Sequence, residues 1–124
     1  MDENTTHQIN QGDIFWLTVD DPRSSETPIR HPHVVVQEDV FNHSRVTSVI
    51  VCALTSNLQR ASLPGNVLLD DGEANLSRQS VVEVAKVSSV EKSELGDYIG
   101  TLSPARIMQI LDGLRFLQTS YFRR

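Results

Sequence analysis

The chain has 124 residues, which is the length of one ordinary domain. Hydrophobic residues make up 39% and charged residues 22% of it, which is typical of a globular protein and excludes a disordered or fibrous one. The 16 acidic residues outnumber the 11 Lys and Arg and give a net charge of −5. This balance argues against a surface that binds nucleic acid everywhere, but it leaves room for a local basic groove.

The cysteine content and the start of the chain narrow the class of protein further. A single cysteine, Cys52, excludes an internal disulfide framework and a thiolate zinc cluster. Cys52 lies in an apolar stretch, where we expect a small buried residue and no nucleophile. The first residues lack the cationic and apolar segments of a secretory signal, and no apolar stretch is long enough to span a bilayer. We therefore expect a cytoplasmic protein without membrane contact.

Five or six segments after a polar lead (residues 1–11) have the composition of β-strands. They are short, rich in β-branched and aromatic residues, and bounded by turn-forming residues. The third is the most apolar, and we expect it at the middle of the sheet. The segments are residues 13–19, 33–39, 46–55, 66–70, 80–90 and, as a short last strand, 97–101.

Two loops and a helix complete the predicted fold. Residues 20–32 contain three prolines, which disfavour regular structure, and residues 56–64 are polar, so both segments are expected to be loops. Ser103 and Pro104 are typical of a helix start, and apolar residues then recur at helical spacing from Ile107 to Leu117. We expect a mainly β single domain over residues 12–124, with a small curved sheet or open barrel and a C-terminal helix packed on it.

Several short motifs occur in an order and spacing that resemble the MazF/PemK/Kid toxin family, from about Gly12 to the final helix. The resemblance implies an SH3-like or CcdB-like barrel and a homodimer. It also implies a sequence-specific, metal-independent endoribonuclease, without cofactor, that cuts single-stranded mRNA at short sequences and is held inactive by a cognate antitoxin. The motifs are Gly12-Asp13-Ile14-Phe15-Trp16, Ser25-Glu26, Pro32-His33-Val34-Val35-Val36, Gln37-Glu38-Asp39, Val51-Cys52-Ala53-Leu54-Thr55, Leu63-Pro64 and Arg78-Gln79-Ser80-Val81.

The resemblance implies catalytic roles for three residues. Thr55 falls where the family has a catalytic threonine or serine. The family usually has Arg-Pro before the second strand, whereas this chain has Arg30-His31-Pro32. His31 therefore occupies the arginine position, and Arg30 precedes it by one residue. Successive residues of an extended chain point to opposite faces, so this displacement decides which side chain reaches the site.

The chemistry of RNA cleavage suits both side chains in different ways. Attack by a ribose 2′-hydroxyl needs a base, an acid and donors to the phosphoryl oxygens. Arginine holds phosphate well but carries protons poorly, because its pKa lies above about 12. Histidine titrates near pH ~6.5 and carries protons readily. One hypothesis is that Arg30 and His31 divide the role that the family gives to one arginine; the other is that the site is weakened or inactive.

We expect RNA contacts from polar residues of the two loops. Glu26 occupies the acidic position of the family's Ser-Glu-Gln loop, while arginine and amide side chains can hold phosphates and read unstacked bases. The predicted RNA-binding residues are Arg23, Glu26, Ser56, Asn57, Gln59 and Arg60. His31 and His33 lie two residues apart, but without a third ligand they predict no metal site.

Structural explanations compete with these functional ones. Thr55 can simply end a strand, and a loop can be polar because it is solvated. One alternative function is a CcdB-like module that binds a protein such as DNA gyrase without catalysis, which the acidic charge favours slightly. A second is a regulatory protein that kept the barrel and lost the site. The fold alone does not choose among them.

Overall fold

The computed structural model describes residues 7–19 and 29–122. In this part of the chain a single antiparallel sheet is accompanied by α-helices and 3₁₀-helices. The elements in chain order are β1 (Asp13–Val19), β2 (Ile29–Val35), α1 (Asp39–Asn42), β3 (Ser48–Thr55), η1 (Leu58–Ser62), β4 (Val67–Leu68), η2 (Glu73–Asn75), β5 (Val81–Glu91), η3 (Lys92–Glu94), β6 (Tyr98–Thr101) and α2 (Pro104–Phe122).

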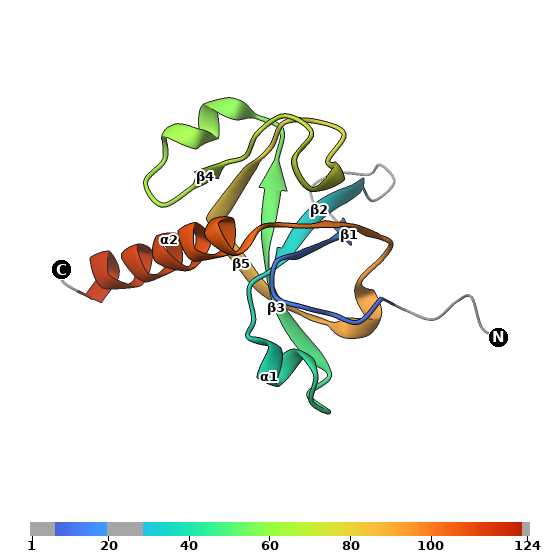
Figure 1. Cartoon of the computed structure of the whole chain (residues 1–124). Helices are drawn as coiled ribbons and strands as arrows, with labels where there is room; N and C mark the ends of the chain where they lie inside the picture. Colours follow the sequence, from blue (N-terminus) through green and yellow to red (C-terminus); the bar gives the residue numbers. More distant parts are fainter. Residues whose placement is uncertain (1–6, 20–28, 123–124) are drawn as a thin grey trace.

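The sheet has the strand order β4-β5-β3-β2-β1-β6. It is curled, and α2 lies across one of its faces (Figure 1). The expected mainly β fold with a curved sheet and a C-terminal helix is therefore confirmed. The expected place of the most apolar strand is also confirmed, because β3 pairs with β2 on one side and with β5 on the other.

Both faces of the sheet are buried at its centre. Alternate residues of a strand face opposite sides, and β3 accordingly gives Cys52 and Leu54 to one hydrophobic cluster and Val49 and Val51 to another. The first cluster also contains Ile110 of α2. Cys52 is fully buried, and burial raises the pKa of its thiol to about 12. It is therefore a packing residue, as expected.

The C-terminal helix begins where the sequence predicts. The Ser103 hydroxyl accepts a hydrogen bond from the backbone N–H of Arg106 at 3.2 Å, and Pro104 is the first helical residue. Ile110 is buried and Leu114 packs against the larger cluster, whereas Leu117 is 37% exposed. In the described part of the chain, no helix is long and apolar enough to cross a membrane.

The predicted bounds of the second strand were wrong. This strand was expected over residues 33–39, but β2 begins at Ile29 and ends at Val35, so part of the expected proline-rich loop is strand. Residues 39–42, expected as strand end and turn, form α1 instead. The expected loop after β3 contains η1. The rest of the proline-rich loop lies outside the described residues.

Pro32 ends the pairing between β2 and β3. The N–H of Val36 donates to the carbonyl of Ile50 at 3.0 Å, so even-numbered residues here direct their backbone donors toward β3. Pro32 belongs to this set but has no N–H to give. The β2–β3 register accordingly stops at His33, while residues 29–32 continue to pair with β1. A proline is tolerated in this strand because its donor side faces a free edge.

Gly113 lets α2 approach the chain before β4 at backbone distance. A Cβ atom on Gly113 would overlap the carbonyl oxygen of Gly65. We expect Gly113→Ala to lower the free energy of unfolding by about 1–3 kcal/mol, because overpacking outweighs the roughly 1 kcal/mol gain in helix propensity. Urea unfolding checks this, with Gln118→Ala on the exposed side of α2 as the control. Unchanged or raised stability in Gly113→Ala would contradict the close contact.

Candidate functional site

The candidate site lies where β2 and β3 separate. The two strands pair from His33–Ala53 to Val35–Val51 and not beyond. Past this point β2 follows β1, while β3 continues along β5. We call the gap between residues 29–32 of β2 and residues 54–55 of β3 the strand opening. A smaller pocket of about 370 Å³ and a larger one of about 660 Å³ meet there, and both are lined by His31, Leu54 and Thr55.

His31 and Thr55 line the same two pockets at the strand opening. His33 faces Ala53, and each outward step moves one residue along both antiparallel strands in opposite directions. By this count His31 has the same side-chain direction as Thr55, and Arg30 the same as Ser56, although the strands no longer pair there. Facing residues of neighbouring strands project to the same side of the sheet. His31 is therefore the better placed of the two candidates to act together with Thr55.

The Thr55 hydroxyl is oriented by the turn that follows β3. Its Oγ1 atom accepts a hydrogen bond from the backbone N–H of Asn57 at 3.1 Å. Asn57 in turn caps η1, because its side-chain oxygen accepts from the backbone N–H of Gln59 at 3.2 Å. Since Oγ1 is the acceptor in this bond, the hydroxyl hydrogen of Thr55 can point to a bound phosphoryl oxygen.

The two histidines of β2 have different environments. His31 is exposed at the strand opening, whereas His33 is only 5% exposed. Burial lowers the pKa of His33, and this effect exceeds the opposing one of the hydrogen bond to the His31 carbonyl. His33 is thus neutral near pH 7, and its Nδ1 donates to that carbonyl at 3.0 Å. Through this hydrogen bond the buried His33 ring holds the backbone of the exposed His31 in place.

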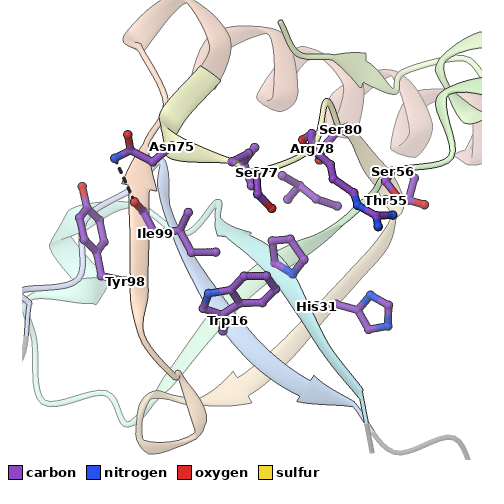
Figure 2. A pocket seen from close by; sticks show the side chains of 13 residues that line it. Trp16, His31, Thr55, Ser56, Asn75, Ser77, Arg78, Ser80, Tyr98 and Ile99 are labelled. Carbon is purple, nitrogen blue, oxygen red and sulfur yellow. Dashed lines mark hydrogen bonds between the residues drawn. The ribbon is translucent and has the colours of Figure 1, made fainter. Parts of the chain in front are cut away.

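Arg78 is a candidate site residue that our sequence analysis missed as a ligand. It lies between η2 and β5 and lines the smaller pocket together with Thr55 and Ser56. Figure 2 shows its guanidinium reaching toward these two residues. A signal was present: the Arg78-Gln79-Ser80-Val81 motif leads into β5, whose first residue, Val81, pairs with Thr55.

Aromatic residues form another wall of the smaller pocket. Trp16 and Tyr98 both line it, beside Asn75 and Ile99 (Figure 2). The guanidinium carbon of Arg30 lies 4.5 Å from the centroid of the Trp16 ring, which is the geometry of a cation–π contact. Arg30 is thus held beside the pocket without lining it. Neither aromatic residue was predicted to be in the site.

The larger pocket contains a buried acidic residue with two basic partners. Glu83 is 5% exposed; its Oε1 lies 3.1 Å from Nε of Arg60, and its Oε2 lies 3.8 Å from Nζ of Lys86. Arg60 is held in this position, because removing it would leave the buried Glu83 carboxylate without this partner.

The predicted RNA-binding residues are therefore not brought together as one group. Ser56 lies beside Thr55 in the smaller pocket. Asn57 caps η1, Gln59 lies in its first turn, and both line neither pocket, while Arg60 faces Glu83. Arg23 and Glu26 lie outside the described residues. The RNA-binding roles of all six stay predictions.

A family model matches residues 10–117 of the chain; it describes the PemK-like, MazF-like toxin of type II toxin–antitoxin systems. The chain belongs to this family. Among its relatives is the endoribonuclease MazF2 of Mycobacterium bovis, 38% identical over 108 residues, which are 86% of this chain and 94% of the relative. Another is the endoribonuclease EndoA of Bacillus subtilis, 27% identical over 107 residues, with 86% and 91% covered.

Solved structures of MazF proteins have the same fold as this PemK-like, MazF-like chain. The MazE–MazF complex of Deinococcus radiodurans has a TM-score of 0.74 at 19% identity, with 92% of this chain and 98% of that one covered. An endoribonuclease in complex with its cognate antitoxin, from Mycobacterial species, has a TM-score of 0.64 at 20% identity, with 88% and 91% covered. The predicted family resemblance is confirmed.

The neutral state of His33 makes the stability of this PemK-like, MazF-like chain depend on pH. Burial lowers the pKa of His33 in the folded protein, so the unfolded chain binds more protons when the pH falls below about 6.5. We expect the free energy of unfolding to decrease as the pH falls through this range. In His33→Gln, whose amide can still donate to the His31 carbonyl, the decrease should be smaller.

Urea unfolding of the wild type and the variants between about pH 5.5 and pH 7.5 measures this dependence. The control is His43→Gln, because His43 is exposed. Equal pH dependence in wild type and His33→Gln would show that His33 is not held neutral.

Proposed function

We propose that this toxin is a metal-independent endoribonuclease that cuts single-stranded RNA by attack of a ribose 2′-hydroxyl. The observation that supports the proposal is that His31 and Thr55 line the same two pockets where Pro32 ends the β2–β3 ladder. The names of the curated relatives, which match over most of their length, support the same activity. They do not favour the alternative of a non-catalytic module that binds a protein.

The three catalytic candidates divide the reaction. In the proposed mechanism His31 takes the proton of the 2′-hydroxyl, and the 2′-oxygen attacks phosphorus. The bond from phosphorus to the 5′-oxygen breaks, and that oxygen takes a proton from water, which leaves a 2′,3′-cyclic phosphate and a 5′-hydroxyl. Thr55 donates its hydroxyl hydrogen to a phosphoryl oxygen as negative charge develops there. Arg30, held over Trp16, binds a neighbouring phosphate.

Arg78 supplies the positive charge that the smaller pocket needs. Its guanidinium lies at the same end of the pocket as Thr55 and Ser56 (Figure 2), and this planar group can hold two oxygens of one phosphate. Ser56 is proposed to contact the same phosphate. Arg23, Glu26, Asn57, Gln59 and Arg60 are proposed as contacts to the rest of the RNA, and Arg60 must leave Glu83 to make one.

The organisation of the protein follows the same proposal. We propose a cytoplasmic toxin with one domain over residues 12–124 behind a polar lead, acting as a homodimer and inhibited by a cognate antitoxin. The family assignment and the antitoxin-bound structures with this fold support these partners.

Cleavage of a long single-stranded RNA in EDTA tests the proposed catalytic residues. We expect the wild type to cut, Thr55→Ala to lose about 10²–10³-fold in kcat through the missing donor, and His31→Ala to lose about 10²–10⁴-fold through the missing base. Arg30→Ala should lower kcat less than either variant, because Arg30 is proposed to bind a neighbouring phosphate and not the reacting one. The control is Thr119→Ala, because Thr119 is an exposed residue of α2. A wild type that is free of antitoxin and cuts only with a metal, or not at all, would contradict the proposal.

Arg78 should contribute mainly through its charge. We expect Arg78→Ala to lower kcat/KM by about 10- to 100-fold and to reduce the dependence of log KM on log salt by about one unit. Arg78→Lys should keep the salt dependence and recover part of the rate, because a point charge replaces the planar fork. The control is Arg115→Ala, because Arg115 pairs with Asp112 on the exposed side of α2. An unchanged salt dependence in Arg78→Ala would remove Arg78 from the phosphate site.

A further inference from the structure

A buried carboxylate organises the N-terminal end of β1. Asp13 is 1% exposed, and three donors from two segments surround it. Its Oδ2 accepts from Nε2 of His7 at 2.9 Å and from the backbone N–H of Asn10 at 2.9 Å. Its Oδ1 accepts from the Thr101 hydroxyl at 2.7 Å. Asp13 therefore ties the segment before β1 to the end of β6.

Tyr98 closes this cluster into a ring of contacts. Thr101 gives its hydroxyl hydrogen to Asp13, so the hydrogen bond between Tyr98 and Thr101 has the tyrosine as donor. The imidazole of His7 stacks on the Tyr98 ring, with centroids 3.8 Å apart and an interplanar angle of 14°. We call His7, Asp13, Tyr98 and Thr101 the His7 cluster. Each member contacts two others.

The His7 cluster adjoins the candidate site through Tyr98 alone. Tyr98 is 40% exposed and lines the smaller pocket. Figure 2 shows it at the end of this pocket away from Thr55 and Arg78, with its ring directed away from the pocket interior, so it can meet only a part of the substrate that passes over the pocket rim beyond the reacting phosphate. His7 covers one face of its ring, and the exposed remainder of the ring is available to a ligand.

We propose that His7 is a positioning residue that holds Tyr98 as a platform on which a base of the bound single-stranded RNA stacks. The inference rests on the proposed function and deepens it. Unpaired bases stack on exposed aromatic side chains, which is the common means of binding single strands. A tyrosine that is already fixed loses less freedom on binding, so the contact gives more affinity.

Histidine suits both contacts in a way that other residues do not. Its ring is flat enough to stack on Tyr98, and its Nε2–H can donate to the buried Asp13 carboxylate at the same time. Phenylalanine retains only the stacking, and glutamine retains only the hydrogen bond. Asp13 keeps its bonds from Asn10 and Thr101 in either case, so these two variants separate the contact that positions Tyr98 from the contact that satisfies the carboxylate.

Steady-state cleavage of an RNA oligonucleotide tests the positioning role. In His7→Ala we expect KM to rise about tenfold with kcat nearly unchanged, since the platform binds substrate without touching the reacting atoms. His7→Phe should restore most of the affinity, and His7→Gln should not. The matched control is His43→Ala, because His43 holds the same N-terminal segment through Asn10 at 2.8 Å without contacting Tyr98. Its KM should equal that of the wild type.

Two measurements keep this test separate from the proposed activity. The first is NMR of the His7 ring protons, which the Tyr98 ring current should shift upfield in the wild type and not in Tyr98→Leu. The second is the affinity of an uncleavable 2′-O-methyl RNA oligonucleotide for wild type and His7→Ala. A wild type that cuts no RNA overturns the proposed function, whereas the affinity ratio still decides the role of His7.

Several results would overturn the role of His7. Equal KM values and equal oligonucleotide affinities in wild type and His7→Ala would do so. Full recovery by His7→Gln would assign the effect to the Asp13 hydrogen bond and not to stacking. A fall in kcat without a change in KM would place His7 in the chemical step. An equal rise of KM in His43→Ala would attribute the effect to the whole N-terminal segment.

Discussion

The missing backbone donor of Pro32 determines where this sheet opens. The β2–β3 ladder stops at His33 because the next donor directed toward β3 would come from a proline, and β2 then follows β1 while β3 follows β5. The pockets that His31 and Thr55 share and the approach of Arg78 both depend on this separation. The residue that shapes the site therefore needs to contribute no side-chain chemistry of its own.

The charges of the folded chain explain how an acidic protein can present a basic site. Buried or half-buried carboxylates are paired within the fold, Glu83 with Arg60 and Glu73 with Arg106. The Arg106 guanidinium holds the pKa of Glu73 below its usual range, despite the opposing effect of burial. Arg30 and Arg78 are directed toward an aromatic ring and a pocket instead. Net charge thus says little about the local field at the strand opening.

Local signals made most of the fold predictable, whereas tertiary contacts determined what was missed. The composition of residues 13–19 and the Ser103-Pro104 start of α2 suffice to place these elements. The prolines of residues 20–32 favoured a loop, because the sequence does not show that one side of β2 is unpaired. Arg60 was predicted to bind RNA because the sequence does not show that Glu83 is buried beside it. Arg78 was not predicted because it reaches Thr55 only through the folding of the loop before β5.

Because β1 pairs with β6, the sheet cannot be completed until almost the whole chain has been synthesised. Asp13 lies opposite Thr101, so β6, from near the end of the chain, completes one edge of the sheet beside β1, from near its start. A ribosome releases the N-terminal strands first, and β6 follows all the others. His31 and Thr55 are therefore synthesised some time before β6, which contains Tyr98. The unfinished chain therefore lacks part of the proposed RNA-binding pocket while its own messenger is still being translated.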